Sequence, residues 1–137
     1  MKKSFFNLSV LFITALSFVA CKKEKSFEEK VTGEWTSMSV KLNGNDVTNY
    51  FSLDLNLRSD KDFRATLKTV NIVTGKNETS YPRGAWSADD GKEIELTYND
   101  TGKTEFYEVL EFTGTKLTVE TIQNTDKVEI TFERANQ

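Results

Sequence analysis

In the stretch GEWTSMSVKL, residues 33–42, apolar and polar residues follow a pattern that recurs along the chain. In its second half, Met38, Val40 and Leu42 alternate with polar residues. Successive side chains of an extended strand point to opposite faces, so this spacing gives one apolar and one polar face. The stretch therefore predicts a β-strand with one face buried and the other in water.

The same two-residue period returns along the rest of the chain, without convincing helical periodicity past the N-terminal segment. Turn-forming residues such as Asn43-Gly44 and Asp89-Asp90-Gly91 separate the segments. Connections this short favour antiparallel neighbours, because parallel strands need long crossovers. We therefore predict an all-β fold, an antiparallel up-and-down eight-stranded barrel that removes exposed edges, with a β-sandwich as the alternative. The strands are expected at residues 34–42, 51–58, 63–73, 79–88, 92–98, 103–113, 115–122 and 127–134.

Two of these strands depart from simple alternation. In residues 63–73 the apolar face switches after Leu67, which predicts a bulge or a bend. In residues 103–113 both faces carry apolar side chains, with Phe106 on one face and Tyr107 on the other. Such a strand is expected to be covered on its outer side, by the N-terminal tether or by a partner.

Residues 1–20 have the character of an export signal. Lys2 and Lys3 give a basic start, and residues 4–20 are largely apolar. A basic start, an apolar middle and a small residue before the cleavage point are the features of a secretory signal. The small residue here is Ala20, and the only cysteine of the chain, Cys21, follows it directly.

Residues 16–21, LSFVAC, resemble the lipobox of bacterial lipoproteins. The resemblance implies that Cys21 carries a diacylglycerol and that residues 1–20 are removed. It places the chain in the bacterial cell envelope, anchored in the outer membrane on its periplasmic face or at the cell surface. Two or three acyl chains hold a protein to a bilayer effectively permanently, whereas one gives marginal binding.

The segment after the cysteine is dense in charge. Residues 21–30 are therefore expected to form the lipidated end and a polar tether, and residues 31–137 the barrel domain. Within the tether, Ser26 and Glu29 have capping-box spacing, which predicts one helical turn over residues 27–31.

Composition excludes several classes of function. The chain has 137 residues, a formal net charge of −3, one cysteine and no histidine. This length fits one domain, and an acidic chain lacks the basic face that nucleic acids require. Without histidine, Ser-His-Asp triads, Cys-His dyads and most zinc ligand sets cannot form within the chain. We expect no enzyme, no catalytic residues, no metal site and no cofactor.

Three further stretches resemble known families. Gly33-Glu34-Trp35 resembles the Gly-x-Trp signature of lipocalins, and Arg134 matches the arginine that packs over this tryptophan. Gly84-Ala85-Trp86 with the following hairpin, and residues 109–119, are similar to the lipocalin-like domain of bacterial envelope lipoproteins. The resemblance implies structural roles for Gly33, Trp35 and Arg134, and a barrel that holds a small apolar ligand. Candidates for the lining, each of which could also be ordinary core, are Phe51, Leu55, Phe63, Trp86, Tyr98 and Phe106.

The sequence therefore predicts a lipid-anchored, non-catalytic lipocalin-like barrel that binds a small apolar ligand. The alternative is an interaction or assembly lipoprotein with a solid core, whose outer surface binds another envelope protein or a glycan. A continuous interior cavity would favour the first function. An exposed apolar patch near Tyr107 and Val109 would favour the second.

Overall fold

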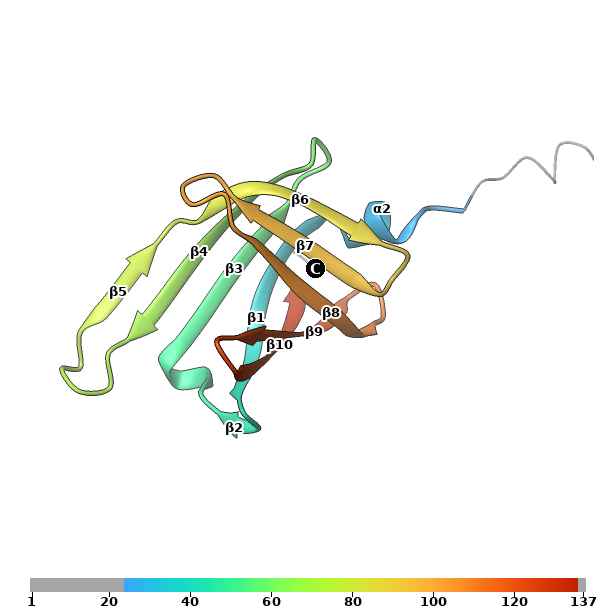
Figure 1. The fold of residues 1–137 in the computed structure, drawn as a ribbon. Coiled ribbons are helices and arrows are strands. Elements are labelled where there is room, and N and C mark those ends of the chain that lie inside the picture. The colour runs from blue at the N-terminus through green and yellow to red at the C-terminus, as the bar shows by residue number, and fades with distance from the viewer. Residues whose placement is uncertain (1–23, 136–137) are drawn as a thin grey trace, which may run out of the picture.

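The computed structural model describes residues 24–135, which form one antiparallel sheet that curls on itself, with a short helix at one end (Figure 1). The elements in chain order are α2 (Phe27–Val31), β1 (Gly33–Leu42), β2 (Asn45–Asp46), the 3-10 helix η1 (Thr48–Tyr50), β3 (Phe51–Leu57), β4 (Asp62–Val70), β5 (Asn77–Ser80), β6 (Arg83–Asp89), β7 (Glu93–Tyr98), β8 (Thr104–Phe112), β9 (Lys116–Gln123) and β10 (Asp126–Arg134).

Eight of these strands form a closed ring. Neighbours pair in the order β1, β3, β4, β6, β7, β8, β9 and β10, and β10 pairs back onto β1. The closing register runs from Trp35 opposite Arg134 to Leu42 opposite Val128. A sandwich would keep two sheets with separate edges, so the barrel prediction is confirmed and the sandwich alternative is wrong. The short strands β2 and β5 extend β1 and β4 beyond the ring.

Most strand ends lie within one residue of the prediction, and larger differences occur at two places. β4 ends at Val70, because the Asn71 Oδ1 accepts the N–H groups of Val73 and Thr74 and turns the chain. The side chains of Ile72 and Val73 lie in this turn and are 75% and 94% exposed, so the predicted strand over residues 63–73 is three residues too long. The predicted strand over residues 79–88 is divided at Pro82, which has no N–H for the ladder.

The predicted helical turn is confirmed as α2. The Ser26 Oγ caps it by accepting the Glu29 N–H at 3.2 Å. The helix is also part of the folded unit. Val31 is fully buried, and the Phe27 ring meets Phe112 edge to face at 5.2 Å. Residues 27–30, which the sequence assigned to the tether, therefore cover one end of the barrel.

The core is the inner face of the ring. Alternate residues of each strand point inward and pack together, as the two-residue period requires. β1 runs from the end that α2 covers to the opposite end, so these two ends of the barrel are here called the closed end and the open end. The buried inward residues of the strands are Trp35, Val40, Leu55, Leu57, Phe63, Trp86, Ile94, Leu96, Tyr107, Leu117, Val119, Ile130 and Phe132.

Candidate functional site

The closed end is sealed around Trp35. Its indole N–H donates to the Val31 carbonyl at 2.8 Å, and the Arg134 guanidinium lies over its ring, 4.3 Å from the centroid. Arg134 also donates to the carbonyls of Lys30, Thr32 and Gly114, at 2.6, 2.9 and 2.9 Å. It thereby ties α2 to the β8–β9 turn.

Gly33 is fitted to this arrangement. Its φ of 138° is in the region that favours glycine, and an added Cβ would collide with the Arg134 Nη1. Gly33, Trp35 and Arg134 therefore meet at one point and hold the closed end together.

The open end is hollow. The barrel encloses a cavity of about 450 Å³ there, whereas deeper in the barrel the side chains leave a void of only about 20 Å³. Most of the lining is aliphatic or aromatic, and it comes from strands all around the ring. The lining residues are Val40, Leu42, Val47, Phe51, Leu53, Leu55, Phe63, Ala65, Leu67, Pro82, Leu96, Tyr98, Glu105, Tyr107, Thr121, Gln123, Val128 and Ile130.

Four of the six predicted lining residues lie in this cavity wall: Phe51, Leu55, Phe63 and Tyr98. Trp86 is buried but lies outside the wall. Its indole N–H donates to the Arg58 carbonyl at 2.8 Å, in the β3–β4 turn, so it belongs to the packed core.

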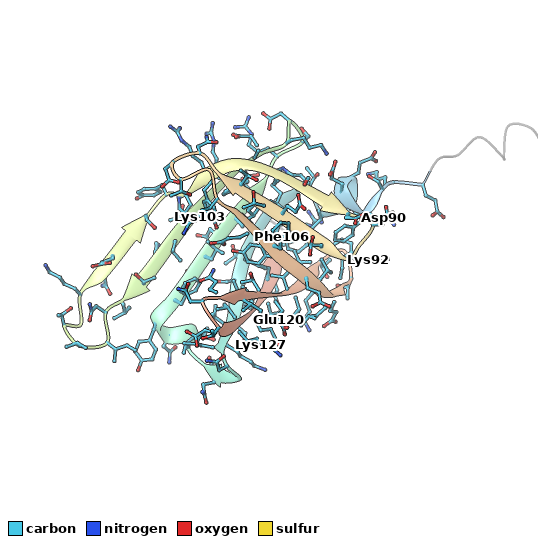
Figure 2. All side chains as sticks on the ribbon, viewed as in Figure 1. Asp90, Lys92, Lys103, Phe106, Glu120 and Lys127 are labelled. Atoms are coloured by element: carbon cyan, nitrogen blue, oxygen red, sulfur yellow. The ribbon has the colours of Figure 1, made fainter. Side chains whose placement is uncertain are left out.

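The prediction for Phe106 is wrong, because its side chain is 50% exposed on the outer face of β8 (Figure 2). In the β7–β8 ladder Phe106 stands opposite Glu95, whereas Tyr107 stands opposite the buried Ile94. Both faces of β8 are apolar, so the period could not fix which one lies inside. Exposed apolar residues are present on this strand, but they are Phe106 and Leu110 rather than Tyr107 and Val109.

Sequence reasoning also missed a polar cluster in the cavity wall. The hydroxyls of Tyr98 and Tyr107 both donate to the Oε2 of Glu105, at 2.9 and 2.5 Å. Burial raises the pKa of both tyrosines, and the adjacent Glu105 carboxylate raises each further. Both phenols therefore stay protonated and remain donors. The only sequence signal for this cluster was the alternation that places Glu105 and Tyr107 on the same face of β8.

The cluster is positioned by the β7–β8 hairpin. Tyr98 ends β7 and Glu105 follows the start of β8, facing Leu96 across the ladder. Gly84 lies between Phe63 and Tyr98 in the sheet, and an added Cβ there would collide with the Thr97 carbonyl. Because Gly84 has no side chain, the rings of Phe63 and Tyr98 meet across it edge to face at 5.5 Å.

Within residues 24–135, no three His, Cys, Asp or Glu side chains are grouped so that they could hold a metal ion. The same part of the chain contains no helix that is both long and apolar enough to cross a membrane. Cys21 and the predicted signal over residues 1–20 lie outside the described residues.

Solved structures with the same fold are found at low sequence identity. The complex of bovine odorant-binding protein with a selenium-containing odorant matches with a TM-score of 0.52 and 10% identity, over 85% of this chain and 77% of that chain. The complex of the same bovine protein with undecanal matches with a TM-score of 0.52 and 12% identity, again over 85% of this chain and 77% of that chain. A redesigned β-barrel matches with a TM-score of 0.51 and 12% identity, over 82% of this chain and 100% of that chain.

No protein-family model matches the chain, and no curated protein sequence matches it. Likeness at such low identity establishes the fold alone. The chain is an all-β, closed, eight-stranded antiparallel barrel, a fold that it shares with these structures.

Proposed function

We propose that this chain is a lipid-anchored, non-catalytic binding protein of the bacterial cell envelope, and that its barrel holds one small apolar molecule. The observation that carries the proposal is the cavity of about 450 Å³ with its mainly apolar wall. Pockets for small ligands have volumes of about 300–1,000 Å³ and mainly apolar walls with a few polar groups. The Glu105 cluster supplies such polar groups.

The fold of the neighbours supports a binding role. Two of them are structures of an odorant-binding protein, one with a selenium-containing odorant and one with undecanal. Eight-stranded barrels have an interior of about the right width for one small ligand.

The proposed anchor would give the cavity an orientation. Cys21 precedes the helix cap Ser26 by five residues, which span at most about 18 Å when extended. Since α2 covers the closed end, acyl chains on Cys21 would hold that end toward the bilayer. The cavity mouth would then face away from the anchoring membrane and take its ligand from the aqueous side.

Native mass spectrometry of residues 22–137, which include every element of the barrel, tests the binding role. We expect a reproducible adduct of small mass that is lost on denaturation. Ala65→Leu, which extends a side chain into the cavity, should reduce the adduct, whereas Ala85→Leu on the exposed face of β6 should not. A bare polypeptide mass that stays unchanged after incubation with decanol would contradict the proposal.

The anchor is tested separately in the full chain. Cys21→Ser should abolish attachment of diacylglycerol and release the protein from the membrane fraction of a bacterial host. A variant that stays membrane-bound and still carries the lipid would contradict the anchor, while the binding role of the barrel would be unaffected.

A second candidate function is interaction with another envelope protein or a glycan through the outer surface. The β4–β5 hairpin projects from the barrel and presents Ile72 and Val73 at its tip, where both are largely exposed (Figure 1). Replacing both residues by serine should abolish cross-linking to a partner in intact cells and leave the cavity adduct unchanged. Unchanged cross-linking would contradict this candidate.

A further inference from the structure

The cavity wall contains one charged side chain among the residues that line it, Glu105. Its Oε2 accepts both tyrosine hydroxyls, and within residues 24–135 no hydrogen bond reaches Oε1 and no cation pairs with the carboxylate. Glu105 is half-buried, so its carboxylate is partly removed from water, which is costly for a charge unless it is paired and hydrogen-bonded. Two phenol donors offset part of this cost and leave the negative charge without a counterion.

This arrangement discriminates between ligand head groups. A carboxylate head would bring a second negative charge close to the half-buried Glu105, where the surrounding apolar wall screens like charges less than bulk water does, which is unfavourable. The two tyrosine hydroxyls are already donating to Glu105, so each offers a ligand only its oxygen as an acceptor. The cluster as a whole therefore accepts hydrogen bonds and attracts positive charge.

We infer that the barrel selects an amphiphile whose apolar body ends in a protonated primary amine, and that the ammonium group binds at Glu105. This inference rests on the proposed function, since it names the ligand class of the same cavity. An ammonium has three donors and supplies the charge that Glu105 lacks, and hydrogen bonds between ionised partners are the strong ones. The aromatic rings of Phe51 and Tyr98 in the same wall are compatible with a nearby cation.

Binding of three ten-carbon compounds to residues 22–137 tests the inference: decylamine, decanol and decanoate share one tail and differ in the head group. Calorimetric titration near neutral pH should give one site. Decylamine should bind at least about tenfold more tightly than decanol. Decanoate should bind most weakly.

A matched pair of variants assigns the preference to the carboxylate. Glu105→Gln keeps an acceptor for the tyrosines and removes the charge, so decylamine and decanol should then bind within about threefold of each other. Glu108→Gln removes the same charge from the exposed face of the same strand and should keep the full preference.

The outcomes separate this inference from the proposed function. If none of the three compounds binds, the proposed function fails. If decanoate or decanol binds as tightly as decylamine, the barrel is still a binding protein and the inferred ligand class is wrong. An amine preference that persists in Glu105→Gln, or disappears in Glu108→Gln, would equally overturn the role of Glu105. Should Glu105→Gln not fold, the order of the three compounds on the unmodified protein decides the matter alone.

Discussion

At the closed end of the barrel, Trp35 fills the interior and Phe112 and Arg134 pack against it, whereas at the open end the same strands enclose about 450 Å³. The two ends share one two-residue pattern and one ring of hydrogen bonds. Alternation therefore decides which side chains point inward, while their size and the cover from α2 decide whether they fill the space. The difference shows that one set of strands can form a packed core at one end and a cavity at the other.

The ends also differ in how their charged groups are satisfied. Arg134 donates to three carbonyls and covers an aromatic ring, so its hydrogen-bonding capacity is largely used. Glu105 accepts two phenols on one oxygen and has no cation beside it among residues 24–135. The first arrangement stabilises the fold, and the second leaves capacity for a ligand.

Truncating Trp35 at the closed end should have the largest effect on stability. Trp35→Ala deletes a fully buried indole and leaves a cavity, so we expect the free energy of unfolding to fall by about 3–5 kcal/mol. Urea unfolding followed by circular dichroism measures it. Tyr81→Ala, at a side chain that is 74% exposed, should cost under about 0.5 kcal/mol. A Trp35→Ala loss below about 1 kcal/mol would mean that the closed end is not the packed end.

Arg134→Met should have the next largest effect. The change removes three hydrogen bonds and the contact over Trp35, and we expect it to cost about 2 kcal/mol in the same unfolding measurement. Arg134→Lys should recover only part of the lost unfolding free energy, because an ammonium cannot reproduce the planar set of donors of a guanidinium. The control is Arg64→Met, which removes an exposed ion pair of 3.8 Å with Asp62 and should cost under about 0.5 kcal/mol. An equal loss of stability in Arg134→Met and Arg64→Met would contradict the structural role of Arg134.

At the open end, the buried hydroxyl of Tyr107 should make the free energy of unfolding depend on pH under alkaline conditions. Burial raises the pKa of Tyr107, so below about pH 10 this phenol is protonated in both the folded and the unfolded chain and adds no pH dependence. Above that pH the unfolded chain loses the proton while the folded chain keeps it. Stability should therefore fall by about 1.4 kcal/mol per pH unit from this residue. Unfolding of Tyr107→Phe from pH 8 to 11 should show a shallower decline, and identical slopes would contradict the burial of a protonated phenol.

The smallest effect on stability is expected at the cavity wall. Phe51 is half-buried and borders space that is already open, so Phe51→Ala should cost about 1 kcal/mol of unfolding free energy and weaken decanol binding about fivefold. Phe106→Ala on the outer face of β8 should change the affinity for decanol by less than about twofold. If both variants weaken binding equally, the ligand does not occupy the cavity.

Much of the barrel was predictable from the sequence because each strand carries its own local signal. The alternation in residues 34–42 and 127–134 gave the two strands that close the ring, and Ser26 with Glu29 gave the helical turn. The prediction failed at Ile72 and Val73, where apolar residues lie in a turn held by the Asn71 side chain. β-propensity reports the preference of single residues, and a side-chain hydrogen bond to the backbone can override it.

The candidate site was predictable only in part. Phe51, Leu55, Phe63 and Tyr98 were found because their strands have one apolar face, whereas Phe106 was misplaced because β8 has two. Glu105 and Tyr107 were missed because nothing in the linear pattern distinguishes an inward glutamate from the many outward ones. The phase of β8 is set by its partner β7 across the ladder, and that pairing is a property of the assembled sheet.

An antiparallel all-β chain with inward and outward residues in alternation follows from the sequence pattern alone, since that period is local and covalent in origin. Tertiary structure alone decided that β10 meets β1, that α2 and Arg134 fill one end, and that the other end stays hollow around Glu105. These features depend on contacts between residues far apart in the chain, where side-chain volumes and charges either fill the interior or leave space in it.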